Sequence, residues 1–194
     1  MQKLTRDDLH SLEDYSIMRD EFRAQVIQHK KNRVLQVGPN VTMHFEDRLV
    51  MHYQIQEMLR AEKIFESEGI QEELDAYNPM IPDGSNWKVT FMIEFPDPDE
   101  RAVRLREMLG IEDVTYVQVS GHDKVNPISD EDLPRETAEK TASVHFMRLE
   151  LTQDMVSDLK NGAALSVGID HPKYQYAIEA LPASMRDSLV ADLD

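Results

Sequence analysis

Four polar side chains recur every four residues in the first third of the sequence: Arg48, His52, Gln56 and Arg60. In a helix this spacing stacks them along one face. Glu57 precedes Arg60 by three residues, so these two side chains can form an ion pair. Such a face can line a polar cleft that binds an anion between the two arginines, with Arg48, Gln56, Glu57 and Arg60 as its residues. The alternative is a solvated helix face with ordinary side-chain pairs.

Imidazole and carboxylate groups offer a second chemistry, the binding of a divalent metal. Glu57 borders the apolar stripe of its helix, where a carboxylate is either ion-paired or a metal ligand because an unpaired buried charge is costly. His145 shares a strand face with Met147, and His171 follows Asp170 in a turn. These groups suit iron, manganese or zinc, and their spacing does not choose among the three. The alternatives are a hydrogen-bonded core histidine at His145 and a turn held by its own aspartate at His171.

No stronger signature accompanies these residues. The sequence has no glycine-rich phosphate loop, no nucleophile elbow and no His-Glu-x-x-His pair, so no cofactor is evident from a motif. A basic cluster, Lys30-Lys31-Asn32-Arg33, falls at the expected end of a helix, where cations complement the helix dipole. A phosphate-binding patch is the alternative for this cluster. Any functional site must therefore be assembled from separate segments of the fold.

The composition bounds the classes of protein to which the chain can belong. Its 194 residues include 37 acidic and 21 basic ones, with a formal net charge of −16. This charge argues against nucleic-acid partners and anionic membrane surfaces. The chain has no cysteine, which excludes disulfides and thiolate ligation within it. The apolar runs are short and the first residues lack the apolar core of a signal peptide, so we expect a cytoplasmic protein.

Hydrophobic periodicity predicts the elements that must position these residues. The clearest strand pattern covers residues 87–95, where strict alternation favours an antiparallel sheet with one buried face. The longest predicted helix covers residues 46–65, after a helix that starts at Thr5 and a second helix at residues 16–32. A further turn or two of helix is expected at residues 70–77. Further strands are expected at residues 34–37, 41–45, 114–119, 124–128, 143–151, 164–169 and 174–180, with 114–119 paired to 124–128. Further helices are expected at residues 97–110, 152–162 and 182–194. Residues 129–140 are expected to form an acidic loop or a short helix. We predict one α+β domain over residues 1–194, a mainly antiparallel sheet with helices covering one side.

Several blocks of the sequence resemble an uncharacterised bacterial family, known as a domain of unknown function, over essentially the whole chain. The blocks are FEDR (45–48), YQIQEMLR (53–60), ELDAYNP (73–79), IPDG (81–84), TAEKT (137–141), VHF (144–146) and DHP (170–172). The resemblance brings no established reaction. It implies a genomic setting beside a rubrerythrin-like di-iron protein and an iron–sulfur protein, and hence a role in a redox or oxidative-stress system. The blocks point to Arg48, Gln56, Glu57, Arg60, His145 and His171 for any site.

Two functions of different classes follow from these observations. The first is a non-catalytic accessory or interaction protein, a homo-oligomer such as a homodimer, whose partner is a rubrerythrin-like or iron–sulfur redox protein. The second is an enzyme or sensor with a metal or small-anion site. We prefer the first because the sequence has no catalytic motif and is strongly acidic.

Overall fold

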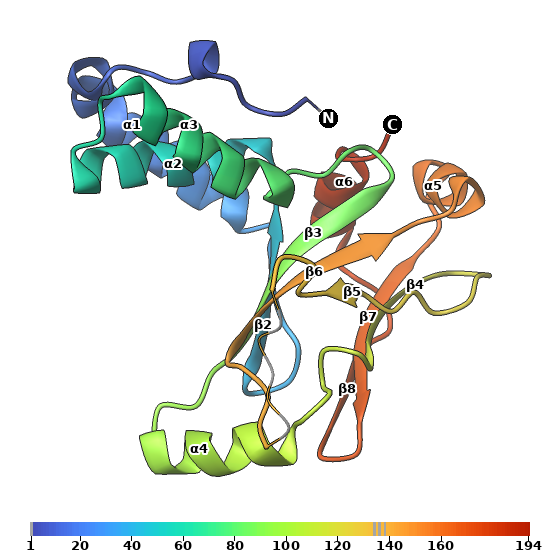
Figure 1. Cartoon of the computed structure of the whole chain (residues 1–194). Coiled ribbons are helices and arrows are strands. Elements are labelled where there is room, and N and C mark those ends of the chain that lie inside the picture. Colours follow the sequence, from blue (N-terminus) through green and yellow to red (C-terminus); the bar gives the residue numbers. More distant parts are fainter. Residues whose placement is uncertain (1, 134, 136, 138) are drawn as a thin grey trace.

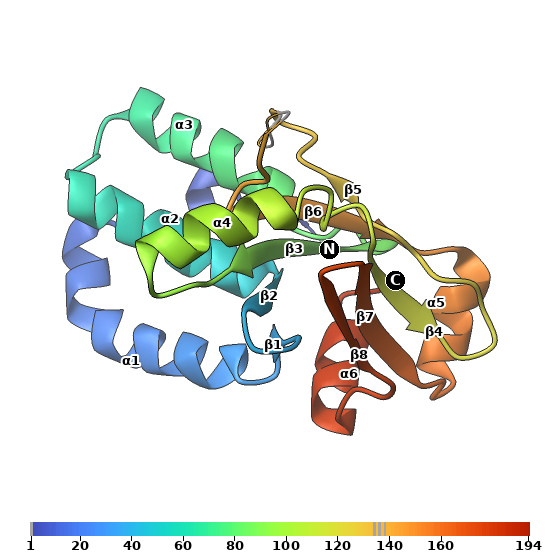
Figure 2. The same ribbon diagram turned by 90° about the horizontal axis from the view of Figure 1, so that it is seen from below.

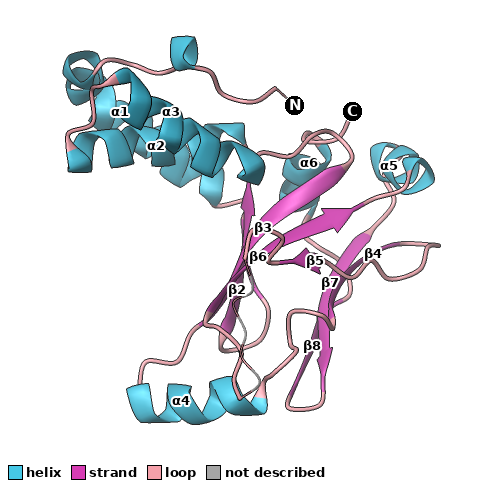
Figure 3. Ribbon diagram, viewed as in Figure 1, coloured by secondary structure: helices cyan, strands magenta, loops and turns pink. Residues whose placement is uncertain are grey.

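The fold has three layers, a group of helices, a five-stranded sheet and a three-stranded sheet. The computed structural model describes residues 2–133, 135, 137 and 139–194. The helical layer lies at the upper left of Figure 1, the larger sheet is central and the smaller sheet lies at the right. Figure 2 shows the same order of layers from below, and Figure 3 separates helices from strands by colour. Residues 134, 136 and 138, which belong to the predicted acidic loop and in part to the TAEKT block, lie outside the described residues.

The helical layer consists of α1 (Leu12–Lys30), α2 (Arg48–Glu62) and α3 (Ser67–Tyr77), with short 3-10 turns at Arg6–Asp8 and Asn78–Met80. Side-chain caps define where the first two helices begin. The backbone N–H of Asp14 donates to Ser11 Oγ at the start of α1, and that of Val50 donates to Asp47 Oδ1 at the start of α2. An apolar cluster joins α2 to α3 and to the N-terminal segment, and it includes Leu4, Met51, Ile55, Leu59, Leu74 and Ile81.

The larger sheet has the strand order β1-β2-β3-β6-β5, and all its pairs are antiparallel. Its strands are β1 (Val34–Gln36), β2 (Val41–Glu46), β3 (Asn86–Ile93), β5 (Ile128–Ser129) and β6 (Val144–Glu150). The smaller sheet has the order β4-β7-β8, formed by β4 (Thr115–Val119), β7 (Leu165–His171) and β8 (Tyr174–Ile178). The main apolar core contains residues from both sheets and from the remaining helices, α4 (Pro98–Glu107), α5 (Gln153–Lys160) and α6 (Ala183–Val190).

Trp87 is the largest side chain in this core. It is fully buried in β3, and its ring meets that of Phe45 edge to face with centroids 6.3 Å apart. Its indole Nε1–H donates to the backbone oxygen of Leu189 in α6 at 2.9 Å. A buried indole needs such a partner, so Trp87 fixes α6 against the larger sheet.

The predicted α+β class and the antiparallel pairing are confirmed, but the strands form two sheets, not one. The expected pairing of residues 114–119 with 124–128 is wrong: only Val125 bridges to Val117, and β5 pairs with β6. The side chain of Asn126 donates to the backbone oxygens of Asp113 and Thr115, and Pro127 has no N–H, so a ladder cannot continue there. That the chain is one domain stays a prediction. In the part of the chain that the structure describes, no helix is both long and apolar enough to cross a bilayer.

Arg33 connects the layers through a buried set of polar contacts. Its guanidinium is 1% exposed, donates from Nε to the backbone oxygen of Phe45 at 3.0 Å, and forms ion pairs with Asp47 and Asp192. It also donates to the backbone oxygen of Ser188 at 3.0 Å. Of the basic cluster predicted at a helix end, Lys30 does lie in the last turn of α1, whereas Arg33 is buried beyond the helix. The helix α1 ends at Lys30, and Arg33 belongs to a buried junction of β2, α2 and the C-terminal segment.

We predict that Arg33→Gln lowers the free energy of unfolding by about 3–5 kcal/mol, because it leaves the buried carboxylate of Asp192 without its cation and Asp47 with His29 alone as ion-pair partner. Arg23→Gln, at an exposed position of α1, is the matched control and changes it by less than about 0.5 kcal/mol. Urea denaturation followed by circular dichroism measures both values. Equal stabilities for the two variants would show that the junction does not hold the layers together.

Candidate functional site

The predicted polar face of α2 contacts other segments of the chain. The guanidinium of Arg48 pairs with Asp8, their closest atoms 2.5 Å apart. Gln56 is fully buried, and its Oε1 accepts the backbone N–H of His10 at 2.7 Å. Arg60 pairs with Glu57 at 3.3 Å. Both arginines of the predicted anion site thus already face carboxylates, and an anion site there stays a prediction.

Glu57 joins α2 to α1. Its carboxylate accepts hydrogen bonds from the Arg19 guanidinium at 2.7 and 2.9 Å and from the Tyr15 hydroxyl at 2.6 Å. These donors, with Arg19 the strongest, lower the pKa of Glu57 to about 2. Next to this group His52 stacks on His10 with ring centroids 5.6 Å apart, and burial lowers the pKa of His52. The α2 face therefore holds the N-terminal segment and α1 in place.

His145 belongs to a buried network of its own. Its Nδ1 lies 2.7 Å from Asp130 Oδ2, and its Nε2 lies 2.7 Å from the Thr141 hydroxyl, which donates to Glu112 at 3.1 Å. The ring is fully buried, so both of its nitrogens need such partners. The second oxygen of Asp130 accepts the backbone N–H of Phe146, which ties the loop after β5 to β6.

His171 lies at the end of β7, away from this network. Its Nε2 is 3.2 Å from the backbone oxygen of Leu109, and its Nδ1 accepts the backbone N–H of Lys173. Glu57, His145 and His171 thus have no partner in common. Among the described residues, no three histidine, aspartate or glutamate side chains are grouped so that they could hold a metal ion. A metal site at Glu57, His145 and His171 stays a prediction.

A hollow lies between the helical layer and the larger sheet, and sequence reasoning missed it. We call it the interlayer cleft; its volume is about 790 Å³. Its walls are mostly apolar, and they come from α2, the end of α3 and the turn that follows it, and β6. Among the wall residues are Val50, Met51, Ala76, Met80 and Phe146.

Polar groups from three neighbouring strands lie in one row at the cleft. Strand register pairs Glu46 of β2 with Lys88 of β3, and Lys88 with Arg148 of β6. Cross-strand partners point to the same face of a sheet, and all three residues line the cleft. Arg148 forms ion pairs with Glu131 and Glu150. By contrast, the Nζ of Lys88 forms no hydrogen bond with a described residue, and no carboxylate oxygen of a described residue lies within 4 Å of it.

Glu46 is the most unusual member of this row. It is 7% exposed, and one carboxylate oxygen accepts the Thr90 hydroxyl at 2.7 Å. The other oxygen, Oε2, has no hydrogen-bond partner within the described chain. Burial raises the pKa of Glu46, although Thr90 and the charges of Lys30 and Arg33 oppose that rise. Burial also lowers the pKa of Lys88. An acid and an amine whose pKa values are both displaced toward neutrality are suited to proton exchange with a ligand.

Strand alternation was the one sequence signal for this site. It places Lys88 and Thr90 on the polar face of residues 87–95 and His44 on that of residues 41–45. Alternation does not reveal that the helical layer covers part of this polar face. It therefore predicts that Lys88, Thr90 and His44 face the solvent. Glu46 was missed because it lay at the predicted boundary between a strand and a helix.

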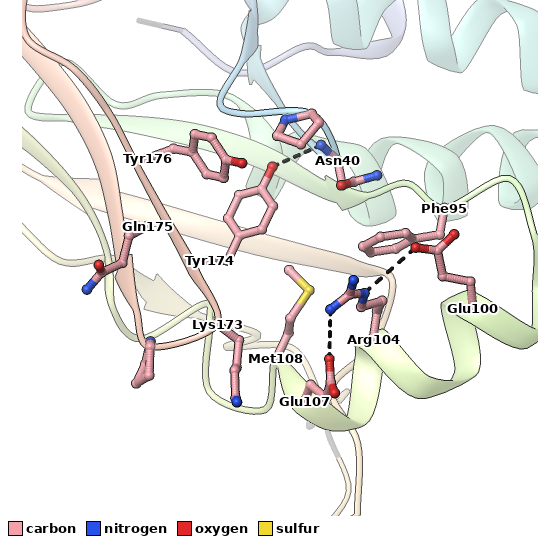
Figure 4. Close-up of a pocket in the computed structure, with 12 residues that line it drawn as sticks. Asn40, Phe95, Glu100, Arg104, Glu107, Met108, Lys173, Tyr174, Gln175 and Tyr176 are labelled. Carbon is pink, nitrogen blue, oxygen red and sulfur yellow. Dashed lines mark hydrogen bonds and ion pairs between the residues drawn. The ribbon is translucent and has the colours of Figure 1, made fainter.

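A second hollow, of about 470 Å³, lies between α4 and the β7–β8 turn (Figure 4). Its charged side chains from α4 pair with one another, since Arg104 lies 3.7 Å from Glu100 and 3.0 Å from Glu107. The Tyr174 hydroxyl is likewise used, because it accepts the backbone N–H of Asn40 at 2.9 Å. We therefore take the interlayer cleft as the candidate site.

We predict that Glu46→Gln is more stable than the wild type at pH 8, because an unpaired amide costs less to bury than an unpaired carboxylate. The folded state raises the pKa of Glu46, so it binds more protons than the unfolded state above pH 4.5. The free energy of unfolding of the wild type therefore falls as the pH rises above 4.5 and Glu46 becomes ionised. The difference in stability between Glu46→Gln and the wild type shrinks as the pH is lowered toward 4.5. Urea denaturation across this pH range measures the difference. A constant difference, or a less stable variant, would contradict the strained burial of Glu46.

Comparison with known proteins gives the family. A crystal structure at 1.90 Å of a novel protein of unknown function from Burkholderia pseudomallei is 47% identical in sequence, has a TM-score of 0.93, and is matched over 100% of both chains. No curated protein matches the chain. Residues 3–193 match the family described as protein of unknown function, DUF3501. The chain therefore belongs to this uncharacterised family, and the expected resemblance to a family of unknown function is confirmed.

Proposed function

We propose that the chain binds a small organic molecule in the interlayer cleft and exchanges a proton with it through Glu46. The observation that carries the proposal is the unpaired Oε2 of a buried Glu46 beside an apolar hollow. Native proteins rarely leave a buried carboxylate oxygen without a partner, and a bound ligand can supply one. The sequence suggested an enzyme or sensor with a metal or small-anion site; the function proposed here is of the same broad class, but its ligand and its residues differ.

The dimensions and the chemistry of the cleft support this proposal. A volume of about 790 Å³ lies within the range of about 300–1,000 Å³ that is usual for small-molecule sites. The walls favour a ligand with an apolar body, and Met51 and Met80 can adapt to its shape because their side chains are flexible. Glu46 and Lys88 then supply the few polar contacts that orient the ligand.

We predict that the neutral apolar dye Nile red binds in the cleft and that Gln54→Trp weakens this binding at least about tenfold, because the indole fills the space beside α2. Ile17→Trp, on an 81% exposed position of α1, is the matched control and leaves the affinity unchanged. A fluorescence titration measures the dissociation constants. Absence of dye binding to the wild type, or equal weakening by both variants, would contradict a binding cleft.

A second candidate function is that of an accessory protein in a bacterial redox or oxidative-stress system. It is supported by the family resemblance and by the net charge of −16, which favours a partner with a basic face. The proposed partner is a rubrerythrin-like or iron–sulfur protein, and the chain would act in the cytoplasm as a homo-oligomer. The absence of cysteine means that the partner, not this chain, would hold any thiolate-bound cluster.

We predict that the tagged chain, purified from its native host at low ionic strength, carries a rubrerythrin-like or iron–sulfur protein with it. Because charge complementarity supports the complex, salt at about 0.5 M should release the partner. Mass spectrometry of the eluate identifies it, and size-exclusion chromatography with light scattering gives the oligomeric state. Recovery of the chain alone under mild conditions would contradict the accessory role.

A further inference from the structure

Lys88 is the one amine at the centre of the cleft's polar row. It lies in β3, the middle strand of the larger sheet, with Glu46 and Arg148 as its cross-strand neighbours. It is half-buried and lines the cleft. No hydrogen bond to a described residue holds its Nζ. By contrast, Lys3 donates to the backbone oxygens of Asn78 and Ile81 at 2.6 and 2.9 Å.

Burial and the charges of neighbouring segments together set the pKa of Lys88. Burial lowers its pKa, and the cations Arg148 and Lys3 act in the same direction. The carboxylates Glu131 and Asp83 oppose this effect, and burial still prevails. An amine in such surroundings is unprotonated in a larger fraction of molecules than an exposed lysine, and only the unprotonated amine is a nucleophile.

We propose that Lys88 forms a Schiff base with a carbonyl compound, an aldehyde or ketone with an apolar body, that binds in the interlayer cleft. This inference rests on the proposed function of the cleft and names the class of its ligand. The apolar walls accept the body of such a molecule, and the row of Glu46, Lys88 and Arg148 receives its carbonyl end.

The chemistry is balanced without any oxidant or reductant. The lone pair of Nζ attacks the carbonyl carbon, and a carbinolamine forms after proton transfer from nitrogen to oxygen. Protonated Glu46 then gives its proton to the hydroxyl group, which leaves as water while the nitrogen lone pair forms the C=N bond. The iminium proton can return to the Glu46 carboxylate. The sum is amine plus carbonyl giving imine plus water.

Glu131, whose charge acts on Lys88, and Glu46, its cross-strand partner, differ in their suitability as the acid. Glu131 accepts two hydrogen bonds from Arg148, which lower the pKa of Glu131 and keep it ionised. Glu46 has a free oxygen and lies directly across the strand pair from Lys88. Glu46 is therefore the group that can hold a proton near the reacting atoms.

The test uses the full-length protein with benzaldehyde as the probe and sodium cyanoborohydride, which reduces an imine to a stable amine. Peptide mapping by mass spectrometry then gives the labelling rate of each lysine. We predict that Lys88 is labelled about tenfold faster than the exposed Lys31. Glu46→Gln should slow labelling of Lys88 at least about tenfold, whereas Lys31→Arg should leave that rate unchanged. The comparison of Lys88 with Lys31 uses the wild-type protein alone, so it tests Schiff-base formation at Lys88 independently of the Glu46→Gln variant.

Labelling that follows exposure alone, with Lys88 no faster than Lys31, would overturn the inference. If Nile red binds to the same wild-type protein, the Schiff base is then excluded and the proposed binding function stands. If neither the dye nor the aldehyde shows a preference for the cleft, both fail. Fast labelling of Lys88 that Glu46→Gln does not slow would overturn the role of Glu46 as the acid.

Discussion

The guanidinium of Arg33 joins segments that are far apart in the sequence. It contacts the end of β2 through Phe45, the start of α2 through Asp47, and the C-terminal segment through Ser188 and Asp192. A buried cation of this kind requires its anions, since removal of one partner leaves a costly charge in the interior. Asp47 also caps α2. The orientation of the helical layer relative to the larger sheet therefore depends on the same group that closes the C-terminal end of the fold.

This constraint explains how the interlayer cleft arises. The larger sheet buries one face in the main core and turns Glu46, Lys88 and Thr90 toward the helical layer. Because α2 starts directly after β2, with Asp47 as its N-cap, it leaves the sheet at the end of β2 and covers the polar face only in part. The space that remains has mostly apolar walls, and the row of Glu46, Lys88 and Arg148 supplies charged groups from the strands. Glu46 stays buried there without a full set of partners, a cost that folds usually avoid and that functional sites commonly retain.

Local patterns predicted the elements better than their assembly. Alternation over residues 87–95 correctly gave β3, and the helix pattern after residue 46 gave α2, because both signals are carried by neighbouring residues. The pairing of residues 114–119 was mispredicted because it depends on long-range register, and Asn126 and Pro127 interrupt the nearer partner. The candidate site was harder still. Arg48 and Glu57 have the spacing of a functional face, but their partners Asp8 and Arg19 belong to other segments, whose proximity no spacing within α2 can reveal.

Trp87 is the only tryptophan of the chain. Because its ring is buried between β3 and α6, tryptophan fluorescence, excited selectively over that of the six tyrosines, reports on the main apolar core. The helical layer that covers the cleft has no such reporter. Movement or partial unfolding of α1–α3 would leave the emission spectrum nearly unchanged while altering circular dichroism. The two spectroscopic signals thus distinguish changes in the helical layer from changes in the main apolar core.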